Sequence, residues 1–304
     1  MKIGFSLDTN RKDADPGKHK FFIRLATEMK TRGIKIDNKK PDVYIYLPGD
    51  SICKKAILNI VRLDNVVLDK NSDPKKRNKK IKKSIKQSDA IVYQSHFSKE
   101  LHDRFLGIKE DKKFRIIFNG ASPDEFLPRN VKNYFLANAK WRECKRLEYI
   151  VGSFLLALNM GLDSDLIITG KSKNRIKHPR IKYLEWQNKK QLKILLSGSI
   201  ASLHLTWLDC CPNSMIEAIV ARCPVIYTRS GGISEIAKNS GIGIKDKEWN
   251  FKPFNAKCSP SIDEEEVALA MLKIKKENMI VNDREDLYIS NICNQYIDFF
   301  KELL

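Results

Sequence analysis

The stretch from Trp207 to Glu235 decides the fold and reads WLDCCPNSMIEAIVARCPVIYTRSGGISE. It contains two points at which a loop leads into a helix. At the first point, Pro212-Asn213 lies between Asp209 and Glu217. We therefore expect Asn213 to cap a helix that carries Glu217 in its first turn.

At the second point, Ser230-Gly231-Gly232 opens a helix with Glu235 in its first turn. Between the two, Cys223-Pro224 predicts a tight turn into a buried strand, Val225–Tyr227. Two neighbouring helix starts direct N–H groups and positive dipole ends into one crevice, which favours binding of a diphosphate. Carboxylates beside that crevice can accept hydrogen bonds from sugar hydroxyls. Glu235 either binds substrate or only favours its helix start.

The same alternation of short apolar strands and amphipathic helices extends over the whole chain. The other predicted strands are Lys2–Leu7, Val43–Leu47, Leu58–Leu63, Ala90–Tyr93, Phe114–Phe118, Tyr134–Asn138, Leu166–Thr169, Ile181–Leu184 and Ala201–Leu205. Predicted helices include Ser98–Phe105, Lys145–Leu158 and Asp286–Leu304. Two successive runs of strand–helix units predict an α/β protein with two Rossmann-like, doubly wound parallel sheets.

Domain boundaries follow from the break in this alternation. Asn119-Gly120, Pro123 and Pro128 mark residues 119–131 as an interdomain linker. We expect a first domain at 1–125, a second domain at 126–285 and a C-terminal helix at 286–304. The general rule for open α/β sheets places ligands at the carboxyl ends of the strands.

Composition narrows the class of protein. The chain has 304 residues, 42% of them hydrophobic, and no apolar run reaches the ~18 residues that span a bilayer. The N-terminus becomes polar too soon for a signal peptide, so we expect a cytoplasmic protein or one peripheral to a membrane. Seven cysteines without a CxxC pair predict free thiols and no metal site.

The net charge of +19 favours anionic partners, although a codon bias toward Lys, Asn and Ile would also produce it. The segment Lys75–Lys86 has eight basic residues in twelve and no acid. It predicts either a solvated helix face or a patch that contacts anionic lipid or an acidic acceptor glycan. It carries too few large apolar residues to embed in a membrane.

With these motifs in view, the chain resembles the retaining glycosyltransferases of family 4, also called group 1 glycosyltransferases, which have the GT-B fold. The segments that carry the resemblance are Asp209…Glu217, RCPVI at 222–226, GGISE at 231–235, AIVYQSHFSK at 90–99, IFNGASPDEF at 117–126 and WRECKRL at 141–147. It covers most of the chain and is strongest from 114 to 236.

The resemblance implies roles for individual residues. Arg142 and Lys145 would neutralise the donor diphosphate and stabilise the leaving nucleotide, with Arg146 as a substitute for Lys145. Asp209 would contact the transferred sugar, and Glu217 the ribose. The other donor-binding residues implied or indicated by helix starts are Asn213, Ser214, Met215, Gly17, Gly231 and Gly232.

The implied reaction is metal-independent transfer of a sugar, with retention, from a UDP- or GDP-linked donor to a glycan, lipid or protein-linked acceptor. The nucleotide sugar is a co-substrate, and no other cofactor is implied. Fixed cations stabilise the leaving group, so no conventional protein base is expected. Acceptor-side candidates are Asp64, after a predicted strand, and His96, before an expected Ser98 cap; a structural role for His96 is the alternative.

Several positions depart from the family pattern. The first domain is short, Pro16-Gly17-Lys18 replaces a glycine pair, and Asp stands for Glu at 209. Two other functions stay open: a nucleic-acid-binding protein that uses its basic surface, and a nucleotide-sugar epimerase or phosphorylase on the same fold. Trp186 either lies near the nucleotide base or packs in the core, and the core is the stronger expectation.

Overall fold

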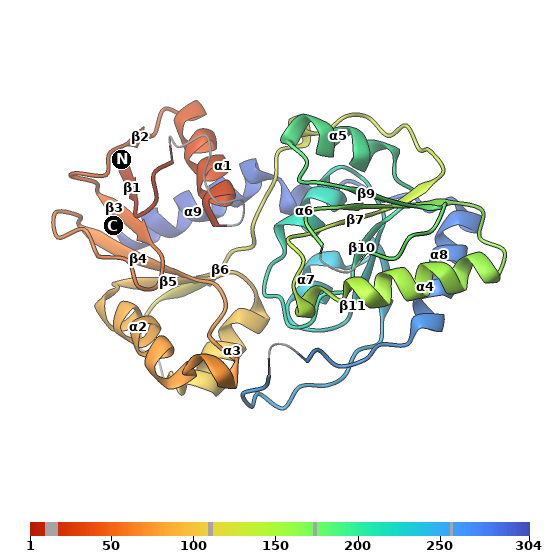
Figure 1. Ribbon diagram of the computed structural model, residues 1–304. Helices are drawn as coiled ribbons and strands as arrows, with labels where there is room; N and C mark the ends of the chain where they lie inside the picture. The colour runs from red at the N-terminus through yellow and green to blue at the C-terminus, as the bar shows by residue number, and fades with distance from the viewer. Residues whose placement is uncertain (10–17, 109–111, 173–174, 256–257) are drawn as a thin grey trace. The chain divides into compact units, whose positions relative to one another are not determined.

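The computed structural model describes residues 1–9, 18–108, 112–172, 175–255 and 258–304, and the chain forms two compact units (Figure 1). Unit 1 comprises Met1–Ser122, Asn250–Asn255 and Glu285–Leu304, and unit 2 comprises Pro123–Trp249 and Ala256–Arg284. Each unit has its own sheet and its own hydrophobic core.

Unit 1 is built on six parallel strands in the order β2-β1-β3-β4-β5-β6. The strands are β1 Lys2–Phe5, β2 Lys35–Ile36, β3 Val43–Tyr46, β4 Leu58–Leu63, β5 Ala90–Tyr93 and β6 Phe114–Ile116. Only the two-residue strand β2 lies outside the predicted strands. Because the strands are parallel, all six carboxyl ends lie at one edge of the sheet.

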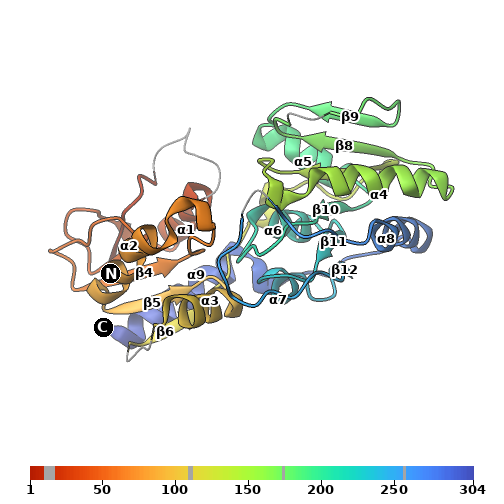
Figure 2. The same ribbon diagram turned by 60° about the horizontal axis from the view of Figure 1, so that its bottom comes forward.

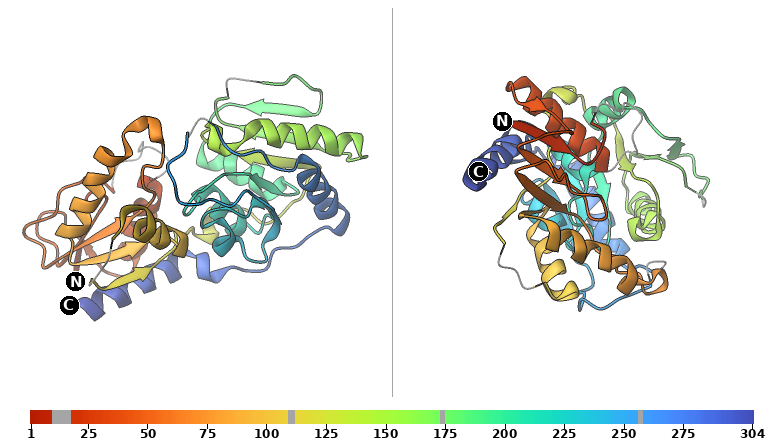
Figure 3. Two further views of the ribbon diagram at one scale, coloured as in Figure 1. Left: turned by 90° about the horizontal axis from the view of Figure 1, so that it is seen from below. Right: turned by 90° about the vertical axis from the view of Figure 1, so that its left-hand side faces the viewer.

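Helices cover both faces of this sheet (Figure 3). They are α1 Lys18–Thr31, α2 Pro74–Gln87, α3 His96–Leu106 and α9 Ile289–Leu303. Phe22 of α1 and Phe300 of α9 belong to one buried cluster with Ile45 of β3. On the opposite face, the Tyr46 hydroxyl donates a hydrogen bond of 2.5 Å to the backbone oxygen of Ser84 in α2.

Unit 2 is also built on six parallel strands, in the order β12-β11-β10-β7-β8-β9. They are β7 Tyr134–Asn138, β8 Asp165–Thr169, β9 Ile181–Leu184, β10 Ser202–His204, β11 Val225–Thr228 and β12 Gly241–Ile244. The two parallel, doubly wound sheets expected from the sequence are therefore confirmed.

The helices of unit 2 are α4 Leu147–Asn159, α5 Lys189–Gly198, α6 Asn213–Val220, α7 Ile233–Ala237 and α8 Glu264–Glu277. α4 and α8 lie side by side along the sheet (Figure 2). Phe154 of α4 and Met271 of α8 share a buried cluster with Ile168 of β8. This cluster is the core that supports the strand ends of unit 2.

Three elements of unit 2, namely β12, α5 and α8, have no counterpart among the predicted ones. The glycines of β12 resemble a turn in sequence, but a Cβ at Gly241 would fall 1.8 Å from the Val225 backbone oxygen. Glycine is thus what allows β12 to approach β11. α8 begins at Glu264, after the N-cap residue Asp263, whose side chain accepts hydrogen bonds from the N–H groups of Glu265 and Glu266.

Three predicted helix starts shift in the structure. α3 begins at His96 because the Ser95 side chain, not Ser98, is its N-cap and accepts a hydrogen bond from the Ser98 N–H. α4 begins at Leu147 because Glu143–Lys145 forms a short 3₁₀ helix instead. α9 begins at Ile289, after a separate 3₁₀ turn at Glu285–Leu287.

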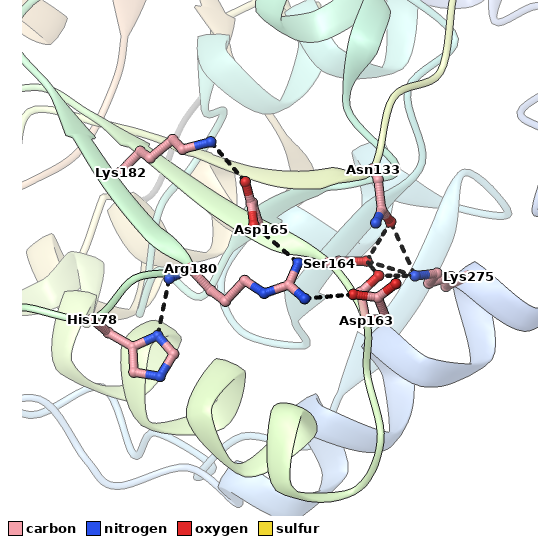
Figure 4. A network of polar contacts seen from close by, with 8 residues as sticks. All are labelled: Asn133, Asp163, Ser164, Asp165, His178, Arg180, Lys182 and Lys275. Carbon is pink, nitrogen blue, oxygen red and sulfur yellow. Dashed lines mark hydrogen bonds and ion pairs between the residues drawn. The ribbon is translucent and has the colours of Figure 1, made fainter.

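A network of polar contacts lies at the amino ends of β7, β8 and β9 (Figure 4). The Lys275 ammonium of α8 donates to Asn133 Oδ1 and to Ser164 Oγ, each at 3.0 Å. Arg180 donates to Asp163 Oδ1 at 2.7 Å. The remaining members of the network are Asp165, His178 and Lys182. These groups tie the amino edge of the sheet together.

Candidate functional site

The predicted donor residues of unit 2 gather at the carboxyl edge of its sheet. β7, β10 and β11 are neighbours, so the loops that follow them begin side by side. The loop after β7 carries Arg142 and Lys145, and the loop after β10 carries Asp209. The loop after β11 carries Gly231 and Gly232. Residues from three distant stretches of sequence thus share one place in the fold.

The centre of this group is an ion pair between Lys145 and Asp209. Lys145 Nζ lies 2.8 Å from Asp209 Oδ2, and the side chains are 13% and 26% exposed. The other carboxylate oxygen, Asp209 Oδ1, accepts a hydrogen bond of 3.2 Å from the Cys211 N–H. Both charged groups are therefore partly withdrawn from water but still reachable.

Opposing effects set the charge state of Asp209. Burial raises the pKa of its carboxyl, but the Lys145 charge and hydrogen bond, the Cys211 N–H and the Arg142 charge together lower it. The net result is a pKa below the usual value of an aspartate. The carboxylate is ionised at neutral pH, as an acceptor of hydrogen bonds from hydroxyl groups must be.

The backbone around Asp209 is held by contacts with the loop after β11. Leu208 adopts a left-handed conformation with φ 56°, and its N–H donates to Ser230 Oγ at 3.3 Å. The Gly232 N–H donates to the Asp209 backbone oxygen at 2.9 Å. Gly231 has φ 64°, and a Cβ there would fall 2.6 Å from that same oxygen. Only glycine fits this close approach.

The loop after β7 is tied to the loop after β10. The Trp207 N–H donates to the Cys144 backbone oxygen at 2.9 Å, within the 3₁₀ helix Glu143–Lys145. Arg142 precedes this helix, and its side chain is exposed. Arg142 and Lys145 therefore present two cations beside one carboxylate, which is an electropositive setting for an anionic ligand.

Arg146 does not belong to this group, contrary to the suggestion that it could replace Lys145. Its side chain is fully buried and forms two hydrogen bonds with Asp246, of 2.8 and 2.9 Å. A left-handed backbone with φ 52° turns this side chain into the interior at the start of α4. Arg146 is thus a structural cation and is not accessible to a ligand.

The helix after Asp209 starts differently from the prediction. Pro212 occupies the N-cap position of α6 without a side-chain hydrogen bond, so Asn213 does not cap the helix but is its first residue. Glu217 consequently lies in the second turn rather than the first, and it is buried, with 2% exposure. Asn213, Ser214 and Met215 form the first turn. Glu235 lies in the first turn of α7, as predicted.

His204, which sequence reasoning did not single out, lies beside the Lys145–Asp209 pair. It is buried in β10, and its Nε2 lies 3.0 Å from Ser202 Oγ. Burial and, to a smaller extent, the Lys145 charge lower the pKa of His204 to about 3, although Asp209 acts in the opposite direction. The alternation of the polar residues Ser202 and His204 in β10 was the available signal, because it places both side chains on one face.

The acceptor-side candidates lie in unit 1, at the carboxyl ends of adjacent strands. Asp64 follows β4, and its backbone oxygen accepts a hydrogen bond of 2.9 Å from Ser98 Oγ in α3. His96 is the first residue of α3 after β5, and it is exposed. Gly17, the third predicted phosphate-facing glycine, lies outside the described residues.

Trp186 is not a core residue, contrary to the stronger expectation. It follows β9, at the same edge of the sheet as Arg142 and Asp209, and its side chain is 53% exposed. The sequence LEWQN gave no periodicity that could distinguish the two positions, because a loop has none.

The described residues contain neither a metal-binding cluster nor a membrane-spanning helix. No cluster of three or more His, Cys, Asp or Glu side chains with the geometry of a metal site occurs among them. Within the same ranges, no helix has the length and apolarity needed to cross a bilayer.

The fold of this chain resembles that of several solved structures. No protein-family model and no curated protein sequence matches the chain. Among solved structures, it is similar to sucrose-phosphate synthase from Thermosynechococcus elongatus, with a TM-score of 0.73, 12% identity, and coverage of 99% of this chain and 98% of that one. It is also similar to HepE of Anabaena in complex with UDP, with a TM-score of 0.69, 12% identity, and coverage of 99% and 100%.

A third structure, AviGT4, is a glycosyltransferase involved in avilamycin A biosynthesis. It matches with a TM-score of 0.63 and 13% identity, over 99% of this chain and 97% of that one. At this level of identity the likeness shows the fold. The predicted GT-B fold, with two Rossmann-like domains, is therefore confirmed.

Proposed function

We propose that this protein is a nucleotide-sugar-dependent glycosyltransferase of the retaining family 4 type, with its donor site in unit 2. The observation that carries the proposal is the Lys145–Asp209 pair with Arg142 beside it, at the carboxyl edge of a parallel sheet. A basic pair and a carboxylate in one place match a ligand that has both phosphates and hydroxyls. Three HepE structures of the same fold contain UDP, UDP and glucose, or UDP-glucose.

The proposed roles divide the donor between these groups. Arg142 and Lys145 bind the diphosphate, and Asp209 accepts a hydrogen bond from a hydroxyl of the transferred sugar. Lys145 has three N–H donors, so it can keep Asp209 as a partner while it donates to a phosphate oxygen. Glu217 binds the ribose hydroxyls. The first turns of α6 and α7, with Gly231 and Gly232 ahead of α7, supply further donors.

The chemistry follows from where charge develops. The leaving nucleoside diphosphate gains negative charge as the glycosidic bond to the sugar breaks. Fixed cations and a helix N-terminus stabilise that charge, so in this proposal the step requires no metal. Retention is proposed through attack on the same face, assisted by the leaving phosphate. Asp64 and His96 of unit 1 are the proposed contacts of the acceptor.

The first experiment is a ligand panel. Wild-type protein is melted with UDP, GDP, ADP and their sugar derivatives, with and without EDTA. One nucleoside diphosphate at a hundredfold its Kd should stabilise the folded state by about 2.7 kcal/mol. EDTA should leave that shift unchanged. Absence of any shift, or complete loss of it in EDTA, would contradict the proposal.

A second experiment tests the site. Glu217→Ala should abolish turnover of the nucleotide sugar and leave the circular dichroism spectrum unchanged. The matched control is Glu302→Ala in α9 of unit 1, whose carboxylate pairs with Arg115 on the surface. Turnover at the wild-type rate in Glu217→Ala would remove Glu217 from the donor site.

We also propose that the protein works on the cytoplasmic side of an anionic membrane, which it contacts through α2. All eight basic side chains of α2 are exposed, whereas Asn78, Ile81, Ser84 and Ile85 are buried. At 3.6 residues per turn, seven of the eight fall within an arc of about 160°. The basic residues are Lys75, Lys76, Arg77, Lys79, Lys80, Lys82, Lys83 and Lys86.

The first turn of α2 contains basic residues and no acidic residue. Its positive charges therefore lie at the positive end of the helix dipole, which is unfavourable. By contrast, α8 carries Glu264, Glu265 and Glu266 in its first turn and lysines in its last. The charge distribution of α2 thus differs from that of α8, so a basic face is not common to all helices of this chain. It has no aromatic side chain to stack on bases, and both isoleucines are buried. These features favour a lipid surface over nucleic acid, at about 1 kcal/mol per basic residue near the membrane.

Vesicle flotation tests this contact. Vesicles with 30% phosphatidylglycerol should bind the protein at low salt and release it at high salt, and neutral vesicles should not bind it. The double variant Lys79→Gln/Lys83→Gln should bind more weakly, and the control Lys189→Gln/Lys190→Gln in α5 should bind like wild type. Binding to oligonucleotides but not to vesicles would refute the membrane contact.

A further inference from the structure

Two residues beside the Lys145–Asp209 pair have a backbone conformation that residues other than glycine rarely adopt. Arg146, which follows Lys145, has φ 52°, and Leu208, which precedes Asp209, has φ 56°. A left-handed conformation is strained in a residue with a Cβ, and it persists only where the surrounding contacts impose it. Such residues cluster at functional sites. The ion pair is thus flanked by strain on both of its strands of chain.

The left-handed conformation of Arg146 interrupts a helix that the local sequence favours. The sequence predicts one continuous helix, Lys145–Leu158, whereas the structure has the 3₁₀ helix Glu143–Lys145 and then α4, with Arg146 between them. Because φ at Arg146 sets the direction in which the chain enters α4, a change to a negative φ would displace Lys145 relative to Asp209.

The buried ion pair with Asp246 is the contact that holds Arg146 in place. Two guanidinium nitrogens donate to the carboxylate at 2.8 and 2.9 Å, and both side chains are fully buried. Such a two-bond fork fixes orientation as well as distance. Asp246 lies on the loop after β12, where its Oδ1 also accepts a hydrogen bond of 2.8 Å from the Lys247 N–H. The pair thus fastens the loop after β7 to the loop after β12.

Stability alone does not account for this pair. Arg146 Nε is buried, and it has no hydrogen-bond partner among the described residues. Two charges withdrawn from water carry a desolvation cost that apolar side chains of similar volume would avoid. An apolar pair would, however, lack the directional fork. The geometry therefore favours a role in fixing the backbone beside Lys145.

We infer that Asp246 is a positioning residue for Lys145 and acts through the buried guanidinium of Arg146. The inference rests on the proposed function, in which Lys145 binds the donor diphosphate. The ammonium must lie where negative charge develops on the leaving phosphate, and a displacement of about 1 Å can lower the rate about 100-fold. The loop after β12, which carries none of the predicted site residues, thereby contributes to the donor site.

The test replaces the ion pair by apolar side chains in the double variant Arg146→Met/Asp246→Leu. This variant leaves no buried charge unpaired, so its circular dichroism spectrum should match that of wild type. Its kcat for sugar transfer should fall about 10- to 100-fold, with a KM for the donor close to that of wild type. A second variant, Arg146→Lys, keeps the charge but lacks the fork, so it should show a smaller loss of kcat.

The matched control is Arg222→Met/Asp283→Leu in the same unit. Arg222 lies between α6 and β11, at the amino edge of the sheet, and it also has a left-handed backbone, with φ 57°. Its Nε donates to Asp283 Oδ1 at 2.9 Å, but the two side chains are 56% and 43% exposed. The control should transfer sugar at the wild-type rate.

A second measurement does not depend on activity. Burial raises the pKa of the Asp209 carboxyl, but the Lys145 charge and hydrogen bond help to bring the net pKa below its usual value. If Lys145 is displaced, an NMR titration of the carboxyl groups should show a higher pKa of Asp209 than in wild type. We expect this rise in Arg146→Met/Asp246→Leu and in Arg146→Lys, and no change in the control.

The outcomes separate this inference from the function beneath it. A wild-type kcat in Arg146→Met/Asp246→Leu would overturn the inference and leave the proposed function standing. A lower kcat with an unmoved pKa of Asp209 would also overturn it, because the loss would not pass through Lys145. If the double variant does not fold, Arg146→Lys decides by the same two measurements. If wild-type protein transfers sugar from no nucleotide sugar, the proposed function fails, and the inferred role in donor binding fails with it.

Discussion

The two edges of the unit 2 sheet are built from the same kinds of charged residue but differ in burial. At the carboxyl edge, the side chains of Lys145 and Asp209 are 13% and 26% exposed, and Arg146 pairs with Asp246 in full burial. At the amino edge, the side chains of Arg180 and Asp163 are 47% and 73% exposed (Figure 4).

This difference decides what each set of charges can do. Exposed ion pairs are screened by water and contribute about 0–1 kcal/mol each. A buried charge that loses its partner is costly, and a partly buried charge acts strongly on a ligand that displaces water. The amino edge is accordingly a set of replaceable surface contacts, whereas each charge at the carboxyl edge should have a large effect.

The largest expected effect is on stability, at Arg146. Arg146→Ala leaves the Asp246 carboxylate buried without its partner, so the free energy of unfolding should fall by about 3–5 kcal/mol. The matched variant at the other edge, Arg180→Ala, should lower it by about 1 kcal/mol or less. Urea unfolding measures both. Equal losses of unfolding free energy in the two variants would contradict the proposed difference between the buried and the exposed ion pairs.

The next effect is on catalysis, at Lys145. Removal of one preorganised group that stabilises transition-state charge typically lowers kcat about 10²- to 10³-fold. We expect this loss in Lys145→Ala, measured as sugar transfer from the nucleotide sugar by protein whose circular dichroism spectrum matches that of wild type. Lys182→Ala at the amino edge should turn over at the wild-type rate. A kcat in Lys145→Ala close to that of Lys182→Ala would contradict the assignment of Lys145.

A pH effect of intermediate size is expected from the buried histidine at the carboxyl edge. Burial lowers the pKa of His204 to about 3, from about 6.5 in the unfolded chain. Below pH 6.5 the unfolded chain gains a proton that the folded chain does not, so stability is present above that pH and falls below it. His204 should account for about 2 kcal/mol of the loss between pH 7 and pH 5.

His204→Gln should therefore lose about 2 kcal/mol less than wild type over that interval. His102 in unit 1 behaves alike, since burial lowers its pKa to about 4. His102→Gln should flatten the pH dependence of stability as well. Denaturant titrations at pH 7, 6 and 5 supply the comparison, and identical slopes in wild type and His204→Gln would show that His204 is not buried in the neutral form.

The smallest effect is expected at the amino edge, at Asp165. A hydrogen bond from Lys182 is the main cause that lowers the pKa of this carboxyl. In Lys182→Ala the pKa of Asp165 should rise toward its usual value, and nucleotide affinity should not change. An NMR titration of the carboxyl groups measures the pKa of Asp165. An unmoved pKa would mean that Lys182 and Asp165 do not pair in solution.

The sequence predicted the fold well because strand burial leaves a strong signal. Runs such as Ala90–Tyr93 and Tyr134–Asn138 are apolar on both faces, as strands of a doubly covered parallel sheet must be. β12 was not predicted from the sequence because its glycines resemble a turn, although in the structure they allow a close contact between strands. α8 was not predicted either, although Asp263 and the glutamates that follow it are a typical sequence signal for the start of a helix.

The sequence located the candidate site only in part. It placed Arg142, Lys145 and Asp209 at strand ends that prove to be adjacent, because parallel strands converge at one edge. It could not tell Arg146 from Lys145, since a left-handed backbone at one residue decides which side chain faces inward. It could not place Trp186, because exposure of a loop residue depends on tertiary contacts.

The most direct measurement is a crystal structure of the protein with the nucleoside diphosphate that stabilises it most. We expect a diphosphate in contact with Lys145 and Arg142, within reach of the loop of Gly231 and Gly232. A nucleotide bound at the amino edge, or one whose phosphates touch neither cation, would contradict it.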